Sequence, residues 1–127
     1  MTVGDLYGNI TKALLDSEKL TVIVGPGGVY DFTPDENTAG PYVVVGEFVE
    51  GPGRLVSCEE TEVTFTIHVW SSSFGRFETL DIKDVINEIL FEMWGECFWL
   101  ESFKLIHDVS QWCHGVLTYR TFIKEEE

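Results

Sequence analysis

The sequence has few basic residues and a large excess of acidic ones. Lys and Arg number 8, whereas Asp and Glu number 22, and the formal net charge is −14. Binding to nucleic acid usually draws on clustered Lys and Arg, and the sequence has no such cluster. A surplus of carboxylates keeps a protein soluble, repels DNA or complements a basic partner. The net charge therefore argues against phosphate binding, but it does not indicate a particular function.

Paired cysteines and long apolar runs are missing too. The 3 cysteines, Cys58, Cys97 and Cys113, form no CxxC pair, so neither a zinc ribbon nor a thioredoxin-type site is indicated, and we expect reduced, partly buried thiols. No run approaches the roughly 20 apolar residues that span a bilayer. The opening MTVGDLYGNITKALLD lacks the basic start and apolar stretch of a signal peptide. We expect a protein made in the cytoplasm, with no membrane partner.

The sequence does have the material for a core. With 127 residues, 44% of them hydrophobic and 13% aromatic, the chain fits one domain, residues 1–127, with a frayed acidic tail at 124–127. Leu6, Ile10 and Leu14 recur at helical spacing and predict an amphipathic helix over about 2–17. The next segment, Leu20 to Val24, is short and rich in β-branched residues, as is typical of a strand.

A second amphipathic helix is predicted from about 74 to 94. It follows the stretch TIHVWSSSFGRFE, residues 66–78, in which Ser72 or Ser73 is placed to cap the helix and Glu78 lies near the positive end of its dipole. The apolar positions of this helix are Phe77, Leu80, Ile82, Val85, Ile86, Ile89 and Leu90.

Two segments predict a long β-hairpin. Residues 42–49 are rich in β-branched and aromatic side chains, with Gly46 as a candidate bulge, and residues 59–70 alternate strictly. We expect them to pair antiparallel through a long tip at 50–60. The alternation places one set of side chains toward the core: Val63, Phe65, Ile67 and Val69.

Two further alternating segments, 99–109 and 115–123, complete the order helix, strands, helix, strands. Nothing in this order resembles repeated βαβ units. The predicted fold class is therefore α+β, an antiparallel β-sheet with two α-helices packed on one face.

No catalytic or metal-binding motif is convincing. The serine run beside His68 lacks the GxSxG elbow of a nucleophilic serine, so helix capping is the favoured interpretation. His107, Asp108, Cys113 and His114 could meet across a hairpin, but their spacing matches no zinc pattern. GPGG and EGPG precede no Lys-Ser or Lys-Thr, so neither is a phosphate loop. We expect no enzyme activity, no metal and no cofactor.

Apolar side chains in expected loops, and on the polar face of an expected strand, need another explanation. The 4 tryptophans are many for this length, and those outside the core are best explained by a partner that buries them. An acidic, non-catalytic small domain of this kind fits an assembly component. The predicted assembly interface consists of Phe48, Val49, Leu55, Val56, Trp70, Phe74 and Trp112.

Four blocks between Val29 and Ile123 resemble a known family. They are VYDFTP, PYVVVGEF, TFTIHVWSSSFGRFETLDIKDVINEIL and HGVLTYRTFI, in that order. Together they resemble the tail completion, or tail terminator, proteins of long-tailed phages and gene transfer agents.

The resemblance implies a structural protein of the virion, located in the tail or neck and without catalytic residues. It implies a six-membered ring on the tail tube, which ends tube polymerisation and presents the surface for the filled head. The implied partners are further copies of the chain, the major tail tube protein and a head-tail connector or stopper protein. DNA would slide through without specific binding, and a lumen lined with Asp and Glu would repel it. Strand edges and the 42–70 hairpin are the expected places for the ring contact.

Three alternatives stay open. A head-closure or connector protein of the same neck region would be equally small and ring-forming. An acidic DNA mimic would carry carboxylates spaced like phosphates along one face. A hydrolase would use His68, His107 or His114 and lose its activity when one of them is changed.

Overall fold

The structure is a computed structural model that describes residues 2–31, 34, 40–52, 60–71, 76–94, 98–107 and 112–124. Within these ranges it contains three helices and a five-stranded sheet, so the predicted α+β class is confirmed. In chain order the elements are α1 (Val3–Asp16), α2 (Glu18–Val24), β1 (Val29–Tyr30), β2 (Tyr42–Pro52), β3 (Glu60–Ser71), α3 (Arg76–Trp94), β4 (Phe98–His107) and β5 (Cys113–Lys124).

The strands lie in the order β1-β2-β3-β5-β4. Only β1 runs parallel to its neighbour, and the pairs β2–β3, β3–β5 and β5–β4 are antiparallel. The predicted hairpin is confirmed by the β2–β3 pairing, and its register shifts between Val45 and Phe48, where Gly46 was the candidate bulge. The part of its predicted tip at 53–59 lies outside the described residues.

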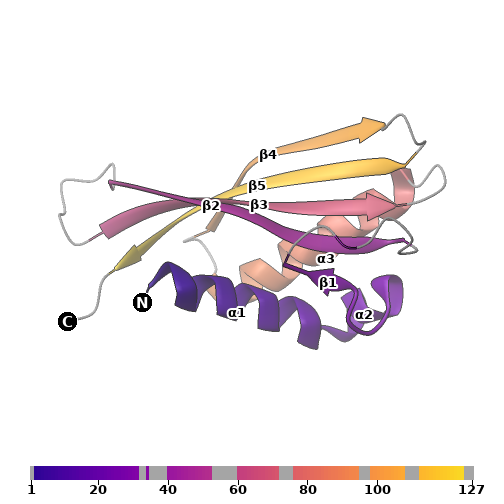
Figure 1. Cartoon of the computed structure of the whole chain (residues 1–127), viewed down its shortest axis with the longest axis horizontal. Coiled ribbons are helices and arrows are strands. Elements are labelled where there is room, and N and C mark those ends of the chain that lie inside the picture. Colours follow the sequence, from indigo (N-terminus) through magenta and orange to yellow (C-terminus); the bar gives the residue numbers. More distant parts are fainter. Residues whose placement is uncertain are drawn as a thin grey trace.

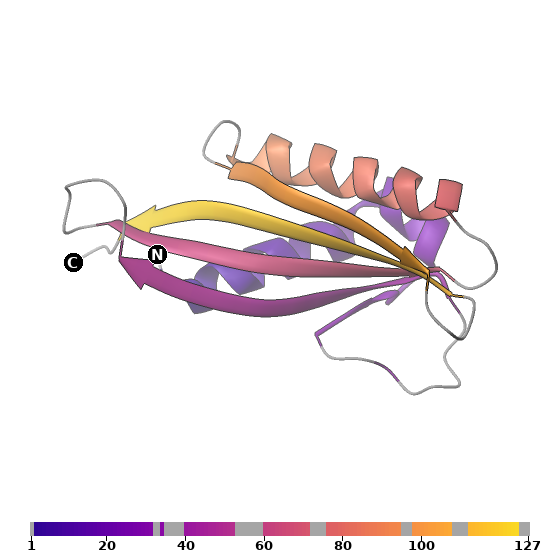
Figure 2. The ribbon, with the colours of Figure 1, turned by 90° about the horizontal axis from the view of Figure 1, so that it is seen from above.

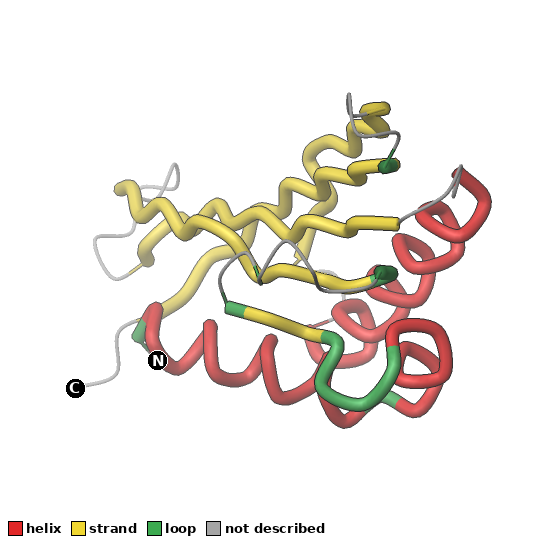
Figure 3. Tube along the Cα trace, turned by 45° about the vertical axis from the view of Figure 1, so that its right-hand side comes forward, coloured by secondary structure: helices red, strands yellow, loops and turns green. Residues whose placement is uncertain are grey.

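All three helices lie on one side of the sheet, and the other face of the sheet carries no helix in the described part of the chain (Figures 1 and 3). Helix α1 contacts β1 and β2, whereas α3 contacts β3, β5 and β4. Figure 2, seen from above, shows the four long strands side by side with the helices behind them. None of the described helices combines the length and apolar character needed to cross a membrane.

The core lies between the helices and the inner face of the sheet. Phe65 is fully buried at its centre, with its ring stacked on Phe48 at 5.2 Å and on Tyr119 at 5.4 Å. Burying one such side chain contributes about 1.5–3 kcal/mol. As the alternation predicted, β3 supplies Val63, Phe65, Ile67 and Val69 to this core, and the helices supply Leu6, Ile10, Leu14, Leu20, Ile82, Ile86 and Leu90.

The segment Leu20 to Val24 is helical, so its interpretation as a strand was wrong. Two signals outweigh the β-branched side chains of this segment. Ser17 ends α1 and also caps α2, with its hydroxyl accepting a hydrogen bond from the Leu20 amide. Leu20 is fully buried in the core, and α2 ends before Gly25, whose φ is 83°.

Helix α3 confirms the predicted second helix, except at its start. Phe77, assigned from the sequence to the apolar stripe, is 85% exposed because it lies on the solvent face of the helix, in line with the exposed Asp81 and Asp84. Ser72 and Ser73, the predicted caps, lie outside the described residues. The last residue of β3, Ser71, is buried and donates a hydrogen bond from Oγ to Oε1 of Glu78 at 2.5 Å, which ties the strand end to the first turn of α3.

Candidate functional site

Aromatic and histidine side chains gather on the sheet face away from the helices. Residues that are paired across β2, β3 and β5 form rows, and the side chains of one row lie on the same face of the sheet. Tyr42, Trp70 and His114 form one such row. We call the group the outer-face cluster, and its members are Tyr30, Tyr42, His68, Trp70, Trp112 and His114.

Ring stacking and a hydrogen bond between two histidines hold the outer-face cluster. The Trp70 indole lies flat on the His114 ring, with centroids 3.8 Å apart and planes 9° apart. His68 Nδ1 and His114 Nε2 are 2.8 Å apart, so one ring donates and the other accepts. The Trp112 ring lies 6.4 Å from Trp70 and 5.8 Å from Tyr42, which joins the two halves of the cluster.

Tyr42 closes the cluster against β1. Its ring meets Tyr30 edge-on at 5.7 Å and it is only 8% exposed. Burial raises the pKa of the Tyr42 phenol, and the neighbouring Tyr30 adds to this. The phenol therefore stays neutral at physiological pH, and this end of the cluster is a packing surface rather than a charged site.

Within the described residues, Ser71 is the one serine of the run, and it does not form a pair with His68. On β3, Ser71 points to the helix side and donates to Glu78, whereas His68 points to the opposite face and contacts His114. Residues at odd and even positions of a strand face opposite ways, so the hydroxyl and the imidazole cannot meet. The favoured interpretation of this stretch as a joint between strand and helix agrees with these contacts.

The residues considered for a metal site are separated as well. Cys113 Sγ lies 3.7 Å from His107 Nδ1, while His114, the next residue along β5, faces the other side of the sheet and contacts His68. Asp108 lies outside the described residues. Within the described ranges, no group of three His, Cys, Asp or Glu is arranged to hold a metal ion.

The predicted interface residues fall in two separate places. Trp70 and Trp112 lie together in the outer-face cluster, each half-buried. Phe48 packs on Phe65 and meets Tyr7 edge-on at 5.8 Å, whereas Val49, the next residue of β2, is 62% exposed. Leu55, Val56 and Phe74 lie outside the described residues. A role of these side chains in assembly stays a prediction.

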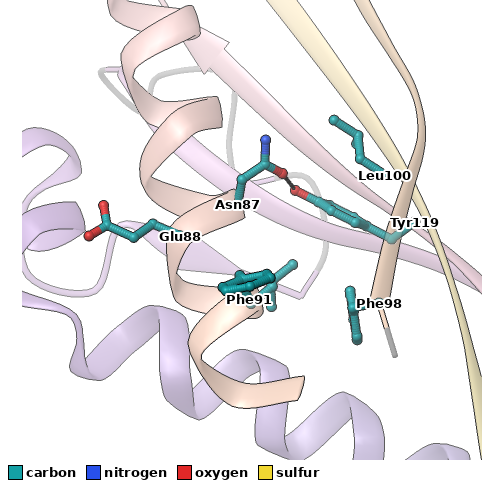
Figure 4. A pocket seen from close by; sticks show the side chains of 7 residues that line it. Asn87, Glu88, Phe91, Phe98, Leu100 and Tyr119 are labelled. Atoms are coloured by element: carbon teal, nitrogen blue, oxygen red, sulfur yellow. Dashed lines mark hydrogen bonds between the residues drawn. The ribbon is translucent and has the colours of Figure 1, made fainter. Parts of the chain in front are cut away.

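Sequence reasoning missed the apolar edge of the sheet at β4. Trp99, Leu100 and Ile106 of this strand are 42%, 38% and 45% exposed. Below Leu100 a pocket of about 400 Å³ opens between β4 and α3, where the Tyr119 hydroxyl meets the Asn87 side chain (Figure 4). The pocket is lined by Asn87, Glu88, Leu90, Phe91, Phe98, Leu100 and Tyr119. The alternation of β4 was visible in the sequence, but nothing there marked it as an edge strand.

Residues 8–124 match the family of tail completion protein gp17. The chain belongs to this family. A tail completion protein is a structural component of a phage-like particle, and its place is the virion tail.

The fold is similar to that of chains in solved structures, including two that overlap with most of this chain. A chain in the virion of a native gene transfer agent particle superposes with a TM-score of 0.73 at 18% identity, covering 91% of this chain and 92% of that chain. The gp17 protein of bacteriophage SPP1 superposes with a TM-score of 0.60 at 24% identity, covering 98% of this chain and 92% of its own. No curated protein sequence matches the chain.

Proposed function

We propose that the protein closes the tail tube as a six-membered ring, ends tail polymerisation and presents the surface to which the filled head attaches. The observation that carries the proposal is the family match over residues 8–124, which spans all five strands and the helices α2 and α3. The sheet supports it, since one face carries no helix among the described residues and holds the outer-face cluster, whose aromatic side chains are suited to a protein partner.

The partners that follow are further copies of the chain, the major tail tube protein and a head-tail connector or stopper protein. DNA passes through the ring without specific binding. Of the described acidic residues, eight lie on the helices, at Asp5, Asp16, Glu18, Glu78, Asp81, Asp84, Glu88 and Glu92, and six lie elsewhere, at Asp31, Glu47, Glu50, Glu60, Glu62 and Glu101. A lumen that repels DNA would be formed most readily by the helix layer, which carries the larger share.

The experiment is electron microscopy of particles made without this gene, with the gene supplied in trans as the control. Overlong or irregular tails beside separate full heads are expected, because nothing would stop the tube. Tails of normal length beside leaking heads would assign the protein to head closure instead. Normal particles would overturn both assignments, and binding to a basic nucleic-acid-binding protein, as expected of an acidic DNA mimic, would be tested next.

A further inference from the structure

The two edges of the sheet are open to different extents. β4 forms one edge along its whole length, Phe98–His107. At the other edge β1 pairs only with Val43 and Val44, so none of the described strands pairs with β2 beyond Val44 on that side. We call residues Val45–Pro52 the open half of β2. Both edges present backbone N–H and C=O groups that can bind another strand.

The directions of these edges are complementary. Each step from β2 to β3, β5 and β4 is antiparallel, so β2 and β4 run in opposite directions (Figure 2). A second copy can therefore place its open half of β2 against β4 and continue one antiparallel sheet. That second copy leaves its own β4 free, so the same contact can be repeated. Such a heterologous contact closes a ring when the rotation that relates neighbouring copies is a whole fraction of a full turn.

We propose that β4 of one copy pairs antiparallel with the open half of β2 in the next copy. The inference rests on the proposed ring and names the contact that builds it. It uses both open edges once per copy. A β4–β4 pair, by contrast, would end as a dimer and leave β2 open in each copy.

The side chains at the two edges fit this contact. Across the sheet, Val49, Thr64, Arg120 and Trp99 lie in one row, and Phe48, Phe65, Tyr119 and Leu100 in another. Continuing these rows into the next copy places Trp99 beside its Val49 and Leu100 beside its Phe48. Trp99, Leu100 and Val49 are the exposed apolar residues of these strands in those rows, at 42%, 38% and 62%, and the contact would bury all three. Arg120 already lies 5.5 Å from the Trp99 ring centroid and orients it.

The register also sets the length of the contact. The row of Lys104 continues to Val44, which β1 already pairs, whereas the rows of Phe98 and Phe103 continue to Glu50 and Val45. The contact therefore joins Phe98–Phe103 of one copy to Val45–Glu50 of the next, and apolar side chains carry it.

The test is cross-linking on assembled tails. Val49→Cys and Trp99→Cys are combined with Cys58→Ser and Cys97→Ser, and purified particles are treated with a short bismaleimide that tolerates a shift of one row. We expect a ladder of covalent multimers from the double variant and only monomers from each single variant. Val22→Cys replaces Val49→Cys in the matched control, because Val22 is 84% exposed on α2, away from both edges, and should give monomers.

Dimers from Trp99→Cys alone would show a β4–β4 contact and overturn the inference. Tails of normal length without any ladder would overturn it too, while leaving tail completion itself intact. If the cysteine variants do not assemble, a pair of introduced charges decides: Trp99→Glu and Val49→Lys should each give overlong tails, and the two together should restore normal length, because the contact places these residues side by side. Failure of the double substitution, with both proteins folded by circular dichroism, would contradict the pairing.

Discussion

His68 and His114 share a hydrogen bond of 2.8 Å between Nδ1 and Nε2, and His114 lies flat on Trp70 at 3.8 Å. The two histidines are 46 positions apart in sequence and on neighbouring strands. Their contact fixes the side chains at the centre of the outer-face cluster, so any partner that binds this face meets a rigid surface rather than three mobile rings.

Changing His114 to Ala should therefore destabilise the protein. The change removes a hydrogen bond, worth about 0.5–1.5 kcal/mol, and an aromatic pair, worth about 0.5–1.5 kcal/mol. Urea unfolding measures the loss. In a double-mutant cycle with His68→Ala, the coupling should be at least about 0.5 kcal/mol. Additive effects of the two changes would show that the rings act independently.

Gly46 is expected to tolerate no side chain. A Cβ there would lie 2.9 Å from the His68 ring and 3.0 Å from the carbonyl oxygen of Thr66. Gly46→Ala should cost about 1–3 kcal/mol in the free energy of unfolding, since ring or backbone must move. Gly51→Ala is the matched control on the same strand, because nothing lies within 4 Å of its Cβ position. The cost should shrink in a His68→Ala background, and equal costs at the two glycines would contradict the crowding.

Tyr119 should make the protein sensitive to alkali. Its hydroxyl donates to the Asn87 side chain, and burial raises the pKa of the phenol. The folded state thus favours the neutral form of the phenol. The stabilisation that Tyr119 contributes is fully present below the unfolded pKa of about 10 and is lost as the pH rises above it. Tyr119→Phe should be less stable at neutral pH, by about 0.5–1.5 kcal/mol, but should lose less stability on going to alkaline pH.

Urea unfolding of wild type and Tyr119→Phe across the alkaline range tests this, with Tyr7→Phe as the control. Parallel losses in wild type and Tyr119→Phe would show that the other ionising groups account for the whole alkaline effect.

Ser71→Ala should lower stability without affecting assembly. The change removes the hydrogen bond to the Glu78 carboxylate, and bonds to charged groups are worth about 1.5–3 kcal/mol. Glu78→Gln keeps an acceptor oxygen and should cost less than Glu78→Ala. Thermal unfolding gives the stability, and tail length in particles gives the function. Overlong tails from a stable Ser71→Ala protein would mean that this stretch is more than a joint.

The sequence predicted the elements whose burial follows a regular period. Leu6, Ile10 and Leu14 indicate α1 because one face of this helix is buried. Phe65 and Ile67 indicate β3 because every second residue of this strand is buried. It failed at Leu20 to Val24, where capping by Ser17 and the burial of Leu20 outweigh the β propensity of the segment.

The candidate site was harder to predict than the fold. Trp70, Trp112, His68 and His114 were noticed singly, but only the register of β3 against β5 brings them together. Likewise β4 and β5 both alternate, but β5 lies between β3 and β4 in the sheet, and alternation alone does not indicate that order. A local pattern indicates which face of a strand is buried, but it does not indicate which strands are neighbours or which strand lies at an edge.

The number of antiparallel strands between the two open edges has an evolutionary consequence. With β2, β3, β5 and β4 in succession, the edges point in opposite directions. A descendant that gained a single antiparallel strand along either edge would have edges pointing the same way, and its sheet could continue only in parallel. One that gained a hairpin would keep the opposite directions. If the proposed contact is correct, relatives should differ at their sheet edges by pairs of strands and not by single ones.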